Sequence, residues 1–191
     1  MGHLARTAYV SLAEYFAAEQ ASEERHEWID GVVYAMSRGS PEHGRLVSAI
    51  NRELGLAHKG RCAVYSESTM LFVQAANLST YADVTLVCGP VLTMTVKKNG
   101  RSLGEAVINP TVIVEVLSPS TERYDRQEKF AYFRQLPSLE EYVLVSQDVR
   151  RIEVFRRPAD ARGSWICEAA GDGEEITVGG SAFQVDAVYT P

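Results

Sequence analysis

Apolar spacing, together with start and stop signals, predicts three helices in the chain. They cover residues 10–20, 41–58 and 121–136. Ser11 stands three residues before Glu14, which is the pattern of a capping box at a helix start. Pro41 suits the first turn of the second helix, and Pro137 ends the third because proline cannot continue a helix.

Short apolar runs bounded by turn residues predict β-strands. Asp30-Gly31 separates two such runs, which is a strong hairpin signal, so we predict a hairpin over residues 27–36. Asn99-Gly100 marks the turn of a second hairpin in an otherwise ambiguous stretch. Further strands are predicted over residues 62–66, 70–74, 83–88, 111–117, 141–145, 151–157 and 164–169.

The strand predicted over residues 111–117 is apolar on both faces. Alternate valines point one way, while Ile113, Glu115 and Leu117 point the other. This pattern is typical of a central strand that is covered on both sides. We therefore predict an α/β protein with a central mixed β-sheet flanked by α-helices, in a single domain over residues 1–191.

Composition and charge narrow the class of protein. The chain of 191 residues is 46% hydrophobic and 23% charged, an ordinary globular mixture. No apolar run approaches the roughly 20 residues of a membrane-spanning helix, and none near the start suits a secretory signal, so we expect a cytoplasmic protein. The net charge of −6 argues against a basic module that coats nucleic acid, but it allows an enzyme with a local basic groove.

The three cysteines, Cys62, Cys88 and Cys167, are odd in number and far apart, and none lies in a CxxC pattern. We expect three free, partly buried thiols, with no disulfide framework and no structural zinc site built on cysteine.

Glu115 and Asp83 are the first candidates for chemistry. A carboxylate inside a doubly covered strand is costly unless a metal ion, a cation or several donors compensate it. The alternatives for Glu115 are a frayed strand edge or a structural arginine partner. Asp83 opens the strand 83–88, where it is either a plain turn residue or an acid at a strand end. If the two strands are neighbours, both carboxylates could face one Mg²⁺ ion.

Lys129, His43 and Glu27 are further candidates, each with an ordinary alternative. Lys129 lies four residues after Asp125, which suits a solvated helix pair or an ammonium leaning over the carboxylates. His43 is on the apolar side of its helix, where a histidine is more often a core residue than a ligand. Glu27 is either a third acid of the site or a surface residue.

Arginines gather late in the chain, where they either cradle phosphates or belong to a solvated surface of mixed charge. They are Arg123, Arg126, Arg134, Arg150, Arg151, Arg156 and Arg157.

Four segments carry a family resemblance that extends from about residue 10 to residue 189. They are HEWIDGVVYAMS with the downstream His43, YADVTLVCGP, PTVIVEVLSPST, and YDRQEKFAYFRQLPSLEEYVLV. In these segments the sequence resembles the Uma-two family of restriction endonucleases, within the PD-(D/E)XK nuclease superfamily. The most specific part is EVLSPST followed by Asp125, Lys129 and Tyr132.

The resemblance implies a restriction-endonuclease-like fold and a metal-dependent nuclease site that acts on DNA. Mg²⁺ is the implied ion, with Mn²⁺ as a substitute. Asp83 corresponds to the aspartate of the first half-motif and Glu115 to the acid of the second, and the backbone carbonyl of Val116 would be an additional metal ligand. Glu27 matches the acidic position before the early hairpin and is implied as a further catalytic acid.

The chain departs from the superfamily pattern at two positions. Ala82 replaces the proline before the aspartate, which leaves the acid itself intact. Leu117 stands where the superfamily has its lysine, two residues after the acid. The resemblance therefore points to Lys129, on the following helix, as the catalytic lysine.

Three functions stay open at this point. The first is an active Mg²⁺-dependent endonuclease, with a homodimer suggested by analogy. The second is an inactive module for nucleic acid or protein binding that keeps the fold. In that case Asp83 would point to solvent while Glu115 pairs with Lys129. The third is an enzyme acting on RNA or a small nucleotide, because such a site recognises phosphate rather than bases.

Overall fold

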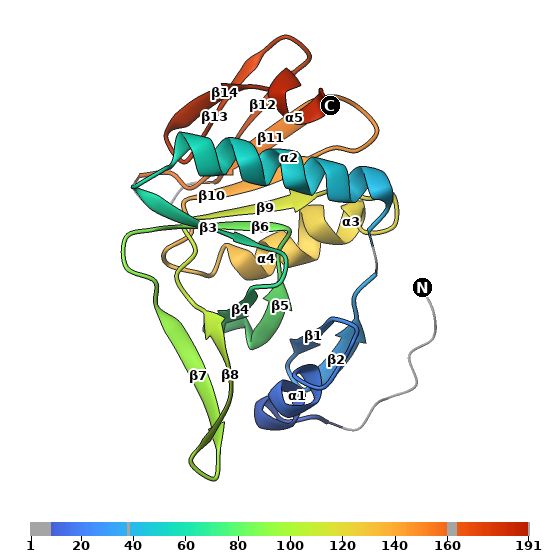
Figure 1. The fold of residues 1–191 in the computed structure, drawn as a ribbon, viewed down its shortest axis with the longest axis vertical. Coiled ribbons are helices and arrows are strands. Elements are labelled where there is room, and N and C mark those ends of the chain that lie inside the picture. The colour runs from blue at the N-terminus through green and yellow to red at the C-terminus, as the bar shows by residue number, and fades with distance from the viewer. Residues whose placement is uncertain (1–8, 38, 160–163, 191) are drawn as a thin grey trace.

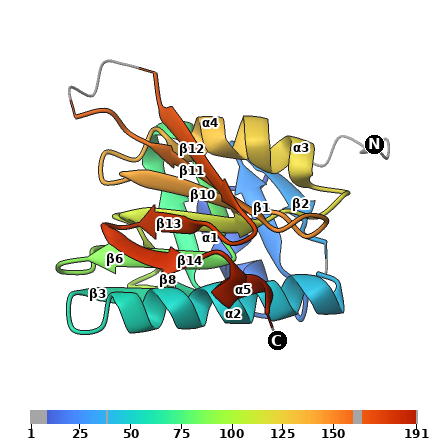
Figure 2. The same cartoon turned by 90° about the horizontal axis from the view of Figure 1, so that it is seen from above.

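The computed structural model describes residues 9–37, 39–159 and 164–190. These residues form two six-stranded sheets and a two-stranded sheet. Helix α2 (Pro41–Ala57) covers one face of the central sheet, and the helical segment of residues 122–133 covers the other (Figure 1, Figure 2). The predicted α/β class and the central mixed sheet are confirmed. Among the described residues, no helix has both the length and the apolar character needed to cross a membrane.

The central sheet has the strand order β12-β11-β10-β9-β6-β3. In that order the strands span Ile166–Gly171, Arg151–Arg156, Glu141–Val145, Val112–Val116, Val84–Cys88 and Cys62–Ser66. Strand β9 pairs in parallel with β10 and antiparallel with β6, so it has a neighbour on each side. Every residue of β9 is buried, as the apolar pattern of both its faces predicts.

The two faces of β9 enter two different apolar cores. Val112, Val114 and Val116 pack into the core under α2, whereas Ile113 and Leu117 pack into the core under the helical segment. The C-terminal elements close the first core, and they are β13 (Glu175–Val178), β14 (Ser181–Gln184) and α5 (Asp186–Tyr189). Glu115 is thus the polar exception on a strand that is otherwise apolar.

The second sheet has the order β2-β1-β5-β4-β8-β7. Its strands span, in that order, Val32–Ala35, His26–Ile29, Leu78–Tyr81, Met70–Val73, Arg101–Val107 and Thr93–Lys98. Both predicted hairpins belong to it, with turns at Asp30-Gly31 and Asn99-Gly100. All four turn residues have positive φ, as the type I′ turn of a two-residue hairpin requires. Helix α1 (Leu12–Glu19) packs on this sheet and begins with the predicted capping box.

The helical segment after β9 is not a uniform α-helix. It consists of α3 (Glu122–Tyr124), a π-helical turn (Asp125–Lys129) and α4 (Phe130–Phe133). The prediction of one helix over residues 121–136 is right in position but misses the π turn. Such turns are rare and are frequently found at functional sites.

Several short elements were not predicted from the sequence. Strand β5 reads LSTY, the hairpin β13–β14 is four residues on each side, and α5 is a single turn. Each of these segments is four residues long, which is too short to show a clear period, so its structure depends on the partners that it meets in the fold.

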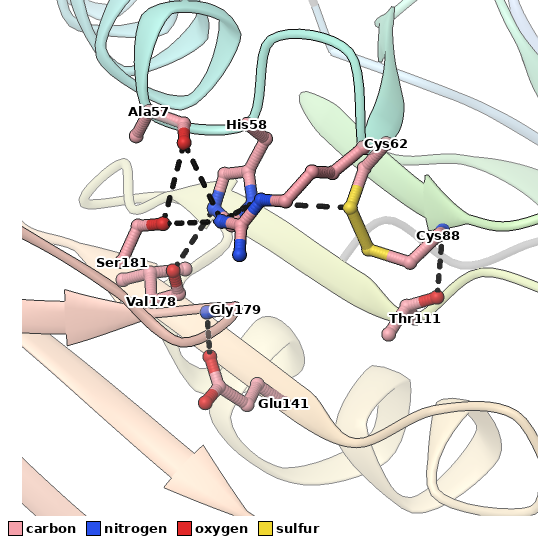
Figure 3. Close-up of a disulfide and its surroundings, with 10 residues drawn as sticks. Ala57, His58, Cys62, Cys88, Thr111, Glu141, Val178, Gly179 and Ser181 are labelled. Atoms are coloured by element: carbon pink, nitrogen blue, oxygen red, sulfur yellow. Dashed lines mark hydrogen bonds between the residues drawn. A yellow bond between two sulfur atoms is a disulfide. The ribbon is translucent and has the colours of Figure 1, made fainter.

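The expectation of three free thiols is wrong. Cys62 and Cys88 form a disulfide between β3 and β6 (Figure 3). Only Cys167 is free, and it is exposed. The two cysteines are opposite each other in the antiparallel pair β3–β6, with their Cα atoms 4.1 Å apart. Strand register brings them together across 26 residues of sequence, which spacing alone does not reveal.

We expect reduction of this disulfide, or the substitution Cys88→Ser, to destabilise the protein. Closing a loop of this length restricts the unfolded chain, an effect worth about 3.5 kcal/mol. Denaturant unfolding with and without a thiol reductant measures the difference. Cys167→Ser is the matched control and should leave the unfolding midpoint unchanged. Identical midpoints for oxidised and reduced wild type would contradict the expectation.

Candidate active site

The predicted site residues lie together at one end of the central sheet. Strand β6 runs antiparallel to β9 with Val84 opposite Val114, which brings Asp83 beside Glu115. Two adjoining cavities of about 550 and 310 Å³ open here. Both are lined by His43, Asp83, Glu115 and Lys129. The neighbouring strands on which the two-carboxylate hypothesis depended are therefore present.

Asp83 is held by hydrogen bonds on both carboxylate oxygens. The backbone N–H of Val116 donates to Oδ2 at 2.7 Å, and the imidazole Nε2–H of His43 donates to Oδ1 at 3.1 Å. The side chain is 16% exposed, so it lies at the cavity wall instead of extending into solvent. This contact raises the pKa of His43, with the hydrogen bond to Asp83 as the main cause.

Glu115 and Lys129 form a buried ion pair. Both residues are 4% exposed, and Lys129 Nζ lies 2.8 Å from Glu115 Oε1 and 3.9 Å from Asp125 Oδ1. Burial raises the pKa of Glu115 well above its ordinary value; the Lys129 ammonium opposes this shift, and Asp83 adds to it. Burial alone would lower the pKa of Lys129, but Glu115 and Asp125 outweigh it and keep the ammonium charged.

Local structure explains how Lys129 reaches Glu115. Leu117, at the superfamily's lysine position, is buried in the apolar core and offers no charge. The π-helical turn instead carries Asp125 and Lys129 inward, and both are buried. Tyr142 on β10 donates a hydrogen bond to the Asp125 carbonyl at 2.9 Å and so anchors this turn to the sheet. Of the two alternatives for Lys129, the solvated helix pair is wrong.

Glu27 belongs to the same cleft but is bound by two hydroxyl groups. It is 8% exposed and lines the smaller cavity. Tyr124 donates to its Oε1 at 2.7 Å, and Thr80 donates to its Oε2 at 3.0 Å. Burial and the nearby Glu27 carboxylate raise the pKa of Tyr124, which keeps the phenol protonated as a donor. Glu27 is thus neither a surface residue nor a direct partner of Lys129.

Sequence reasoning underestimated one residue of the cleft, His43, and missed one residue next to it, Gln147. His43 is half-buried at the cavity wall and bonded to Asp83, so it is not the core residue that its helix position favours. Gln147 was not singled out at all. Its amide donates to the carbonyl of Leu117, and its oxygen accepts from the Ser40 hydroxyl at 2.9 Å. It thereby ties the end of β9 to the start of α2.

The seven late arginines belong to a mixed-charge surface. None of them lines either cavity. Arg126 pairs with Glu153 at 2.6 Å, Arg150 pairs with Asp172 at 2.9 Å, and Arg157 donates to backbone carbonyls. The alternative of a phosphate cradle at the cavities is not what the structure shows.

Comparison with known proteins identifies the family. Residues 12–184 match the model of the Uma2 family, whose description is "Putative restriction endonuclease". The chain belongs to the Uma2 family. The predicted resemblance is thereby confirmed over most of the sequence, including all of the cleft residues described above.

Three proteins are similar to this chain over most of its length. The Uma2 chain is 33% identical to the uncharacterized protein slr1290 of Synechocystis sp., over 94% of this chain and 91% of that protein. It is 30% identical to the uncharacterized protein sll1609 of the same organism, over 91% and 94% of the two chains. A crystal structure from Anabaena variabilis, described as "a putative nuclease belonging to DUF820", superimposes with a TM-score of 0.68 and 14% identity, covering 88% of this chain and 92% of that one. This confirms the restriction-endonuclease-like fold.

The donor groups of the cleft fit a hard divalent cation. Glu27, Asp83, Glu115 and Asp125 supply four carboxylates against one permanent cation, Lys129. Glu115 Oε1 is buried, and the Lys129 ammonium 2.8 Å away is the charge that compensates it. Among the described residues, no three acidic, histidine or cysteine side chains already converge on one point. Mg²⁺ typically takes one or two carboxylates and keeps several waters, which suits this arrangement.

The raised pKa of His43 generates a pH prediction for the metal-free protein. A raised folded-state pKa means that the protonated His43–Asp83 pair contributes its full stability below about pH 6.5, and that the contribution is lost as pH rises through the folded pKa. We expect Asp83→Asn to lower the His43 pKa and to remove this pH dependence of unfolding. NMR titration of the histidine signals measures the His43 pKa, with the distant His58 as an internal control. Denaturant unfolding at several pH values measures the pH dependence of stability. The same His43 titration in both proteins would contradict the assignment.

Proposed function

We propose that this Uma2 protein is a metal-dependent endonuclease that hydrolyses phosphodiester bonds of DNA. The observation that carries the proposal is the buried Glu115 carboxylate, which lies beside Asp83 in an open cleft and faces a charged Lys129 at 2.8 Å. Carboxylates brought together from adjacent strands are the ligands that Mg²⁺ prefers, and Mn²⁺ is a usable substitute.

Each residue has a distinct role in this proposal. Asp83 and Glu115, with the backbone carbonyl of Val116, hold the ion. When bound, Mg²⁺ supplies Lewis-acid activation of water and of the phosphodiester. Lys129 orients the attacking water or stabilises the negative charge that develops on the phosphoryl oxygens. His43 orients Asp83 through its hydrogen bond, so it is a positioning residue rather than a catalytic one.

Glu27 acts on the proposed site indirectly, through the charge of its carboxylate. Its carboxylate accepts two hydroxyl hydrogen bonds and contributes negative charge near Lys129, which helps to keep the ammonium protonated. The two cavities share His43, Asp83, Glu115 and Lys129 in their walls, so the cleft has room for more of a substrate than the reacting bond alone.

One observation favours the inactive-module alternative. Glu115 and Lys129 do form an ion pair, as a purely structural role requires. The other condition for that alternative is not met, because Asp83 is bonded to β9 and His43 and does not point to solvent. The active nuclease therefore remains our proposal.

Divalent-metal binding by calorimetry is the direct test. We expect wild type to bind Mg²⁺ or Mn²⁺, and Asp83→Asn and Glu115→Gln each to weaken binding and metal-dependent DNA cleavage by about 100-fold or more, because partners that do not touch a metal are already worth about 10–100-fold. Glu141→Gln is the matched control. Glu141 is a buried, ion-paired carboxylate of the adjacent strand β10, at the opposite end of β9, so its loss should spare metal binding. Binding that survives both site substitutions would mean that other residues hold the ion.

Variants of Lys129 distinguish a catalytic role of this residue from a purely structural one. Lys129→Met leaves Glu115 buried without a counter-charge, so we expect a loss of about 3–5 kcal/mol in unfolding free energy and a loss of cleavage. The double variant Glu115→Gln/Lys129→Met removes the whole pair and should recover most of that stability but no cleavage. Denaturant unfolding and a cleavage assay give the two readouts. Wild-type cleavage by a folded double variant would contradict the proposed roles.

A further inference from the structure

The hairpin β7–β8, residues 93–107, forms an arm that projects from the body of the protein (Figure 1). We call it the basic arm. Its strands are six and seven residues long, which corresponds to roughly 20 Å at about 3.3 Å per residue. Strand β7 forms one edge of the second sheet, and the same sheet carries Glu27 on β1, three strands inward from β8.

Three exposed cations cluster at the tip of the basic arm. They are Lys97, Lys98 and Arg101, on either side of the Asn99-Gly100 turn. In a chain whose net charge is −6, no Asp or Glu occurs between positions 84 and 104. In the part of the chain that the structure describes, none of the three cations lies within ion-pair distance of a carboxylate, although Lys98 is near enough to Glu14 of α1 to help the Ser11 hydrogen bonds lower the pKa of that carboxyl.

The base of the arm is packed, so the tip is held on a firm support. Phe16 of α1 lies against the arm where Gly104 has no side chain, and a Cβ at that position would come within 3.1 Å of the ring. Met94 and Val96 of the arm join the same apolar cluster. A register shift between Val96 and Lys97 then changes the course of the strand just before the charged tip.

The cleft itself is poorly suited to attract a polyanion. Its larger cavity is lined by five carboxylates and two permanent cations. Both cations are already paired, Lys129 with Glu115 and Arg25 with Glu67 at 3.6 Å. Affinity for a nucleic-acid chain must therefore come from positive charge outside the cleft.

We propose that the basic arm binds the phosphate backbone of the DNA that the cleft cuts, with Lys97, Lys98 and Arg101 as the contacts. This inference rests on the proposed nuclease function. A two-stranded ribbon fits alongside a duplex, and unpaired lysine and arginine side chains are the groups that contact phosphates. The arm supplies affinity for the DNA backbone, while the cleft supplies the groups that cut the phosphodiester bond.

The salt dependence of binding tests the arm directly. Binding of a labelled 30-base-pair duplex is measured in EDTA at several salt concentrations, so no cleavage is needed. The triple variant Lys97→Gln/Lys98→Gln/Arg101→Gln should bind at least about 10-fold more weakly, and its slope of log K against log[salt] should be shallower by about 2–3, close to one unit per lost phosphate contact.

A charge-matched control keeps the test specific. Lys59, Arg52 and Arg134 are exposed cations elsewhere on the chain, and replacing all three by Gln gives the same net charge as the arm variant. The control should keep the wild-type slope. The conservative variant Lys97→Arg/Lys98→Arg should bind like wild type, which shows that charge and not a local disturbance is measured.

Three results would overturn the proposal. They are an equal loss in the control and arm variants, an unchanged slope in the arm variant, or no duplex binding by wild type. An arm variant that associates with itself while its slope is unchanged would mean that the lysines only protect the open edge of β7. Cleavage is assayed separately with Mg²⁺. Arm-dependent binding without any cleavage would therefore reject the nuclease function and leave the arm in place.

Discussion

The ion pair between Glu115 and Lys129 is the constraint on which the rest of the site depends. A carboxylate in a strand buried on both faces is costly, and the pair recovers that cost only when the geometry is good. Strand β9 cannot move outward, because β6 and β10 hold both of its edges and two cores hold its faces. The compensating cation must therefore come to Glu115. The π-helical turn does this by directing Lys129 inward, while Leu117 keeps the second core apolar.

The same constraint sets the electrostatics of the cleft. Asp83 and Asp125 lie close enough to Glu115 to raise its pKa, so one ammonium serves three carboxylates. The structure counters this repulsion only in part, with the His43 and Val116 hydrogen bonds on Asp83. A site with such an excess of negative charge favours a second cation. This preference for a cation follows from the charges of this chain alone.

Much of the fold was predictable, because local patterns determine it. Short stretches of sequence were enough to predict three elements. They are the hairpin at Asp30-Gly31, helix α2 from its periodicity, and strand β9 from its two apolar faces. Long-range features were not predictable in the same way. The Cys62–Cys88 bond and the His43–Asp83 contact depend on strand register and on how α2 crosses the sheet. Lys129 was the intermediate case, since a helix was evident but its π turn was not.

Negative and positive side chains lie in different places: carboxylates line the cleft, and exposed cations lie at the tip of the arm. Several carboxylates line the cleft. Most of the late arginines form ion pairs or donate to backbone carbonyls around β10 and β11. The unpaired cations of the arm lie on a support that is packed by α1 and belongs to the same sheet as Glu27. In the proposed nuclease, a protein with net charge −6 would hold a polyanion through the arm, and no basic side chain beyond Lys129 would be needed beside Glu115. If the arm binds DNA as proposed, changes at the arm would alter affinity while the buried pair of Glu115 and Lys129 stays intact.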